Sequence, residues 1–157
     1  MGLINTIKST DQLMKKATNY TDGTIAWSLR TFPNIMEESG SISVVEYDQE
    51  FEFIVKRCFF IRDVVKGSTR GSHSHKELKQ LILCLNGSFT IHLDNGTEKQ
   101  SIIMKADNLC LFVDGRVWRE MTDFSDNAVM AVLCDREYRF DEVIRDYSQF
   151  KKGVPSR

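Results

Sequence analysis

Short apolar runs separated by turn residues dominate the chain from about residue 41 onward. In chain order they read SISVVEY, FEFIVKRCFFI, QLILCL, SFTIHL, QSIIM, LCLFV and NAVMAVLC. The turn Asp94-Asn95-Gly96 lies between two of these runs, and Asn-Gly is a strong hairpin signal because both residues accept a positive φ. Many short strands with tight turns and no helical pattern between them predict an all-β sandwich or barrel.

Helical patterns occur near the two ends of the chain. Residues 9–17 (STDQLMKKA) begin with cap-forming side chains and predict a short N-terminal helix. Near the C-terminus, apolar residues from Phe140 to Phe150 recur at the spacing of one helix face. With Asp141 as the N-cap, this pattern predicts an amphipathic helix over 141–151 that packs on the sandwich.

The composition is that of a soluble globular domain. The 157 residues include 21 Lys+Arg and 22 Asp+Glu, which gives a net charge of −1. This balance excludes the strongly basic footprint of nucleic-acid binding, and no apolar run reaches the ~20 residues of a membrane span. The cysteines lie inside apolar runs without a CxxC pair, which indicates buried free thiols and a reducing compartment. We therefore expect a cytoplasmic protein with no nucleic-acid or membrane partner.

Two of the three histidines, His73 and His75, are separated by a single residue. On an extended strand their side chains project from the same face, about 6–7 Å apart along the strand. A metal site, a proton-transfer site and chance all remain open on this pattern alone. Without a metal, proton transfer is the best use of the pair, because the ordinary imidazole pKa of ~6.5 makes both protonation states accessible.

The spacing around the pair resembles the first motif of the cupins, which are small double-stranded β-sandwiches, or jelly rolls. The matching positions are Gly67, the His73-x-His75 pair and Gly87. Metal-binding cupins carry a glutamate after the pair and a third histidine in a second motif, where this chain has Gln80 and Trp118. Two imidazoles and a neutral amide hold a divalent ion poorly. We therefore expect no metal and no other cofactor, and a metal-dependent cupin enzyme is the least favoured function.

Longer stretches resemble the sugar 3,4-ketoisomerase family, which is similar to the C-terminal part of WxcM and includes FdtA and QdtA. The resemblance covers about residues 32–152 and rests on KRCFFI (56–61), RGSHSHK (70–76), QLILCLNGS (80–88) and VWREM (117–121). It implies a cupin domain over 32–157 that follows an N-terminal extension over 1–31. It also implies a homodimer in which N-terminal strands are exchanged.

The resemblance implies an isomerase that converts a dTDP-4-keto-6-deoxyhexose into the 3-keto sugar without a metal, in deoxyamino-sugar synthesis for polysaccharides such as O-antigen. A base would remove the proton at C3, an enediol(ate) would form, and a proton would return at C4. The alternative, from a different class, is a non-catalytic cupin that binds a nucleotide sugar.

By matching position, His73 is predicted to be the acid/base that carries the proton. His75 is predicted to be its hydrogen-bond partner or the donor to the developing oxyanion, and the two roles could be exchanged. Arg70 is expected to contact the pyrophosphate or the sugar oxygens. Strict alternation places Arg70 on the opposite strand face from His73, so this role requires a bend at Gly71.

The other predicted substrate-binding residues come from three parts of the chain. Trp118, Arg119 and Glu120 lie on one strand that is expected to line the cavity, and we expect at least Arg119 to touch the substrate. Lys56 or Arg57 would add positive charge for the phosphates, and Gln80 completes the set.

Overall fold

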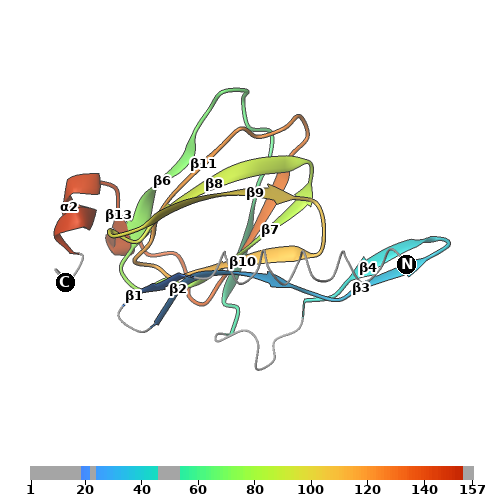
Figure 1. Ribbon diagram of the computed structural model, residues 1–157, viewed down its shortest axis with the longest axis horizontal. Helices are drawn as coiled ribbons and strands as arrows, with labels where there is room; N and C mark the ends of the chain where they lie inside the picture. The colour runs from blue at the N-terminus through green and yellow to red at the C-terminus, as the bar shows by residue number, and fades with distance from the viewer. Residues whose placement is uncertain (1–18, 22–23, 46–53, 154–157) are drawn as a thin grey trace.

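The computed structural model describes residues 19–21, 24–45 and 54–153 of the chain. Two antiparallel sheets face each other as a β-sandwich, and a separate two-stranded hairpin projects from one end (Figure 1). The short C-terminal helix α2 lies at the opposite end of the sandwich (Figure 1). The predicted all-β fold of the cupin type is confirmed.

The larger sheet has the strand order β1-β2-β10-β7-β12-β5. In that order the strands are Asn19–Thr21, Thr24–Thr31, Leu109–Val113, Gln80–Asn86, Val129–Cys134 and Arg57–Ile61. The smaller sheet has the order β13-β6-β11-β8-β9, with strands Val143–Ile144, Arg70–His75, Trp118–Thr122, Ser88–Asp94 and Lys99–Lys105. The projecting hairpin pairs β3 (Asn34–Glu37) with β4 (Gly40–Ser43).

Alternate strand positions fill the space between the sheets. In β8, the buried residues Phe89, Ile91 and Leu93 belong to the main core cluster. The central strands of the larger sheet are apolar on both faces, because alternate residues such as Leu83 and Phe112 form a second buried cluster. Burial on both faces explains why these runs are almost continuously apolar in the sequence.

The predicted hairpin at Asp94-Asn95-Gly96 is confirmed. β8 pairs with β9 in a register that sets Asp94 opposite Lys99. The Asp94 carboxylate accepts a 2.6 Å hydrogen bond from the backbone N–H of Gly96. Gly96 has a φ of +94°, which glycine adopts at little steric cost.

The predicted helix over 141–151 is wrong in its first half. A 3-10 turn, η1 (Phe140–Glu142), is followed by β13, which sets Val143 opposite His75 on the edge of β6. The helix α2 covers only Tyr147–Lys152, and its N-cap is Asp146 rather than Asp141. Val143 and Ile144 form a strand because the edge of β6 offers them backbone hydrogen-bond partners, and β-branched residues favour strands. The spacing of apolar residues along the chain cannot reveal that this edge is available.

The described part of the predicted N-terminal extension contributes two strands. β1 and β2 lie within residues 1–31, yet β2 pairs with β10 along Thr31 to Trp27 and is part of the larger sheet. The described part of the predicted extension therefore belongs to the sandwich. The predicted helix over 9–17 lies outside the described residues.

Three of the four cysteines are buried, and one is exposed. Cys84, Cys110 and Cys134 are buried as predicted, but Cys58 is exposed because it lies on the outward side of the edge strand β5. Within the described ranges, no helix is long and apolar enough to cross a membrane.

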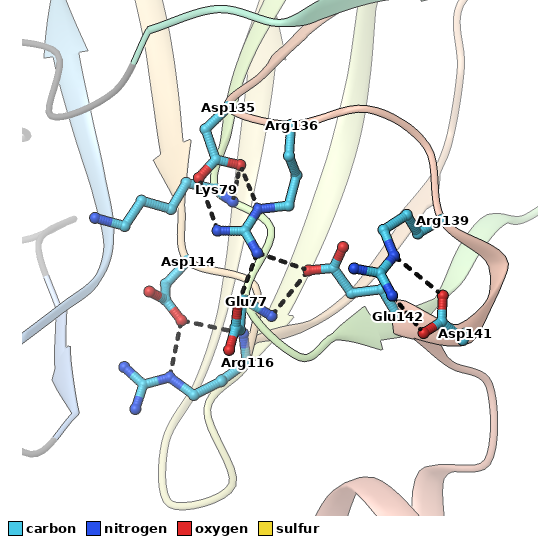
Figure 2. Close-up of polar contacts among 9 residues, drawn as sticks. All are labelled: Glu77, Lys79, Asp114, Arg116, Asp135, Arg136, Arg139, Asp141 and Glu142. Carbon is cyan, nitrogen blue, oxygen red and sulfur yellow. Dashed lines mark hydrogen bonds and ion pairs between the residues drawn. The ribbon is translucent and has the colours of Figure 1, made fainter.

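Ion pairs and hydrogen bonds around Arg136 hold the segment that follows β12 against the connection between β6 and β7 (Figure 2). The guanidinium lies 2.8 Å from Glu77 Oε2 and 3.3 Å from Asp135 Oδ1. The same Asp135 oxygen accepts a 3.0 Å hydrogen bond from the backbone N–H of Lys79. Glu142 Oε1 accepts from the backbone N–H of Glu77 at 3.1 Å. These contacts hold residues 135–142 against the connection that follows the histidine pair.

Candidate active site

A cavity of about 610 Å³ that is partly open to solvent lies against both sheets. It is lined by inward side chains of β5, β6, β7, β11 and β12, and by residues that follow β12 and β13. Both predicted catalytic histidines, His73 and His75, lie in its wall. The predicted residues Arg57, Arg70, Gln80 and Arg119 line the same cavity.

The two imidazole rings are in direct contact. Their Nε2 atoms lie 3.1 Å apart, and the rings meet edge to face with centroids 4.8 Å apart. One Nε2 must carry a hydrogen and donate it to the other, so a single hydrogen lies between the two rings. His75 is buried and His73 only partly buried, so His73 is the ring that is more accessible from the cavity.

A bulge in β6 brings Arg70 to the same side as the histidines. Along β11, Arg119 lies opposite His73 and the next residue lies opposite Gly71, which leaves Ser72 as an extra residue. Gly71 and Ser72 have φ angles of +88° and +53°. A Cβ on Gly71 would meet the Arg119 carbonyl oxygen at 2.8 Å, so only glycine fits there without movement. The bend required at Gly71 is therefore confirmed.

Both histidines are held in the neutral form. Burial lowers the pKa of His73 to about 4, and the positive charges of Arg119 and Arg145 act in the same direction. Burial lowers the pKa of His75 further, to about 2, and Arg119 is again the first charge in order of effect. A neutral imidazole can accept a proton, so at pH 7 the pair is available as a base.

Arg119 is buried in the cavity wall with 1% of its surface exposed. Its guanidinium donates to the side-chain oxygen of Gln80 and, at 2.7 to 2.9 Å, to the carbonyl oxygens of Asp114, Gly115 and Val117. Burial lowers the pKa of Arg119 to about 10, so the group still carries its positive charge at pH 7.

The cavity is strongly positive. Among the described residues that line it, the charged side chains are Arg57, Arg70, Arg119 and Arg145, and none is Asp or Glu. The sequence analysis did not identify Arg145 or Tyr138. Arg145 belongs to the segment 141–151, whose fold was mispredicted, and Tyr138 lies in the connection between β12 and η1. The ion pairs of Arg136 and the β13 pairing place this segment at the cavity.

The structure does not bring Trp118, Glu120 or Lys56 to this cavity. Trp118 and Glu120 lie on the outer face of β11 and line a separate groove, because side chains alternate along the strand and Arg119 takes the inward position. The Trp118 ring packs against Tyr147 and Phe150 of α2, at centroid distances of 5.1 and 5.7 Å. Lys56 is exposed, whereas its neighbour Arg57 points inward.

The described residues contain no group of three or more His, Cys, Asp or Glu side chains that could hold a metal ion. Gln80, at the position of the glutamate of metal-binding cupins, is occupied instead by its bond to Arg119.

The fold and site define a small β-sandwich protein with a histidine pair in a positively charged cavity. Comparison with known families gives a match over residues 26–154 to the family described as "FdtA: WxcM-like, C-terminal". This chain belongs to that family, and the predicted resemblance is confirmed.

Several characterised proteins are similar to the chain. A TDP-4-oxo-6-deoxy-alpha-D-glucose-3,4-oxoisomerase of Aneurinibacillus thermoaerophilus is 39% identical over 123 residues, which cover 78% of this chain and 88% of that protein. A crystal structure of a 3,4-ketoisomerase from Helicobacter canadensis matches with a TM-score of 0.79 and 35% identity, over 86% of this chain and 98% of that one. A third match is the 3,4-ketoisomerase QdtA of Thermoanaerobacterium thermosaccharolyticum, in a crystal structure of a histidine-to-asparagine mutant in complex with TDP-4-keto-6-deoxyglucose. The TM-score is 0.79 and the identity is 33%, over 82% of this chain and 94% of that one.

Proposed function

We propose that this protein is a TDP-sugar 3,4-ketoisomerase that converts a dTDP-4-keto-6-deoxyhexose into the 3-keto isomer. The observation that carries the proposal is the histidine pair, with Nε2 atoms 3.1 Å apart, in a cavity whose charged groups are all arginines. The related proteins are named for this reaction. The product serves the synthesis of deoxyamino sugars in the cytoplasm.

His73 carries the proton in the proposed reaction. As a neutral base it removes the C3 proton, which is acidified by the neighbouring C4 carbonyl. In the enediolate the proton of the C3 hydroxyl passes to the C4 oxygen, and the imidazolium then returns its proton to C4, so that C3 becomes the carbonyl carbon. His75 donates a hydrogen bond to His73 or to the oxygen that becomes negative in the enediolate. The partly buried position of His73 and the buried position of His75 support this division of roles.

The arginines of the cavity bind the charged end of the substrate. A sugar linked to thymidine diphosphate carries a pyrophosphate, and guanidinium groups bind phosphate oxygens through paired N–H donors. Arg57, Arg70 and Arg145 line the cavity and are the groups that we assign to the pyrophosphate. Arg119 and Gln80 are bonded to each other and form part of the cavity wall.

Isotope exchange tests the function. The protein is incubated with dTDP-4-keto-6-deoxyglucose in deuterated water, and turnover incorporates deuterium at C3 of the substrate or C4 of the product. We expect His73→Asn to bind dTDP but to lose exchange by about 10²–10⁴-fold, the usual contribution of a general acid–base.

The matched control is His92→Asn. His92 lies on the outer sheet face between Ser101 and Thr122, so this variant should exchange like the unmodified protein. Ligand binding by the unmodified protein without any exchange would contradict the enzyme function and favour a non-catalytic sugar-nucleotide-binding module. Normal turnover by His73→Asn would contradict the role assigned to that residue.

We also propose that the protein is a homodimer that exchanges N-terminal strands. The β3–β4 hairpin projects from the sandwich (Figure 1) and exposes Ile35, Met36 and Ile42, with 73% of Met36 accessible. Exposed apolar side chains on a projecting hairpin are typical of a subunit contact. Sedimentation equilibrium should give a dimer for the unmodified chain and a weaker dimer for Met36→Asp. A monomeric unmodified chain would contradict this part of the proposal.

A further inference from the structure

Gln80 and Arg119 form a buried pair beside the histidines. The two side chains are hydrogen-bonded to each other, and both line the cavity that contains His73 and His75. Arg119 lies directly across from His73 in the pairing of β11 with β6, where facing side chains are about 5 Å apart at Cβ. The pair therefore stands next to the group that moves the proton.

The guanidinium of Arg119 has only neutral hydrogen-bond acceptors. Besides Gln80, they are the backbone carbonyl oxygens of Asp114, Gly115 and Val117. The Asp114 carboxylate accepts instead from Nε of Arg116, at 3.0 Å. A buried cation is usually accompanied by a hydrogen-bonded carboxylate. The guanidinium of Arg119 donates to none, although the charge of the Asp114 carboxylate acts on it through space and raises its pKa.

The described side chains that line the cavity of the histidine pair include no carboxylate. Its titratable or charged side chains, besides the histidines, are Arg57, Arg70, Arg119, Tyr138 and Arg145. On its other side His75 lines a second cavity together with Lys76, Asp114 and Arg116. Arg119 is the charged group that most strongly lowers the pKa of both histidines. Because Gln80 carries no charge, it leaves the effect of Arg119 on the pKa of the two histidines undiminished.

We propose that Gln80 is a positioning residue whose uncharged amide fixes the Arg119 guanidinium beside the histidine pair without neutralising it, so that both imidazoles remain unprotonated and able to accept the substrate proton. The catalytic benefit of this arrangement rests on the proposed isomerase function. The amide fills the same volume as a carboxylate would, and only its charge is different. A glutamate at this position would pair with Arg119 and also stabilise a protonated imidazole.

The test is Gln80→Glu, which keeps the size of the side chain and adds one negative charge. An opposite charge near an ionisable group shifts its pKa by about 1–3 units. We expect the histidine titration midpoints, followed by NMR of the imidazole protons in the full chain, to rise by about 1–2 pH units. The acidic limb of the pH profile of kcat/KM should rise by the same amount, with activity recovered at higher pH.

Two matched variants serve as controls, and all samples are measured with a chelator present. Gln149→Glu makes the same amide-to-carboxylate change on the exposed face of α2 and should leave the titration unchanged. Gln80→Met removes the hydrogen bond to Arg119 without adding charge, so it should not raise the midpoints. A rise in Gln80→Met equal to that in Gln80→Glu would overturn the proposal, because charge would then not be the cause.

The NMR titration separates this inference from the proposed function, because it requires no turnover. A folded Gln80→Glu variant that titrates like the unmodified chain overturns the inference even if isomerase activity is found. Raised midpoints in a chain without isomerase activity support the electrostatic role and contradict the function. The unmodified chain is itself a test, since histidine midpoints at or above the ordinary value of ~6.5 would overturn the inference without any variant.

Discussion

Two arginines of this protein show how the same side chain is used in opposite ways. Arg119 is buried in the cavity wall and is bonded to an amide and to backbone carbonyl oxygens. Arg136 lies at the surface, with about a third of its side chain exposed, and its guanidinium contacts the carboxylates of Glu77, Asp135 and Glu142 (Figure 2). Arg119 thus has no carboxylate among its hydrogen-bond partners, whereas the guanidinium of Arg136 lies within 3.7 Å of carboxylates from three residues.

The difference appears in the pKa values and in the consequences for the neighbours. Burial lowers the pKa of Arg119, whereas the hydrogen bond to Glu77 raises the pKa of Arg136. The field of Arg119 acts on the two histidines, while the pairs of Arg136 fasten a chain segment. Arg119 therefore influences the protonation of the site, whereas Arg136 fixes the position of a chain segment.

The largest expected effect is on stability when Arg119 is removed. Arg119→Met leaves Gln80 and the carbonyl oxygens of Asp114, Gly115 and Val117 without their buried donor. Each unsatisfied buried acceptor costs about 1–3 kcal/mol, so we expect the free energy of unfolding to fall by about 4 kcal/mol in urea denaturation. The same change at the exposed Arg116 is the control and should cost under about 1 kcal/mol. Equal losses of unfolding free energy in the two variants would contradict the special role of the buried Arg119.

A smaller effect is expected from pH. In the folded chain the pKa of His73 is lowered to about 4, whereas in the unfolded chain it is near 6.5. Below pH 6.5 the unfolded chain binds more protons, so the free energy of unfolding decreases as the pH falls toward 4. Between pH 7 and pH 5, His73 alone should account for a loss of about 2 kcal/mol. Urea unfolding of His73→Asn should lack this part of the decrease, and an identical pH dependence in both chains would refute the assignment.

The smallest effect is expected at Arg136. Its pairs are partly exposed, and pairs of this kind contribute about 0–1 kcal/mol. Arg136→Gln should therefore lower the free energy of unfolding by at most about 1 kcal/mol, and by less in 1 M salt, where surface charges are screened. A loss that is large and independent of salt would indicate that Arg136 is as critical as the buried arginine.

The strands and the histidine pair could be predicted from the sequence because local rules govern them. Alternating or continuous apolar runs mark the strands, and an Asn-Gly turn marks a hairpin. A spacing of two residues placed His73 and His75 on one side of β6, as the structure shows. The need for a bend at Gly71 also followed from alternation, because Arg70 could not otherwise reach the same cavity.

Placements that differ from the predictions have two causes, one local to a strand and one that depends on residues far away in the chain. Glu120 and Trp118 were expected in the cavity together with Arg119, but alternation on β11 sends them to the opposite face. Val143 and Ile144 fitted a helical pattern, yet they complete the edge of β6. The contribution of Arg145 to the cavity follows from that pairing, and nothing in the local sequence indicates it.

By itself, therefore, the sequence determined the class of fold, the family and the pair of histidines that share a strand face, since these depend on spacing along the chain. Only the tertiary structure decided that the imidazoles touch, that Arg119 is buried beside them with Gln80 as its neutral partner, and that the C-terminal segment closes the cavity wall. The physical reason is that burial and charge act through space. Groups from β6, β7 and β11 influence one another only after the two sheets have enclosed them in a medium that screens charge less than water does.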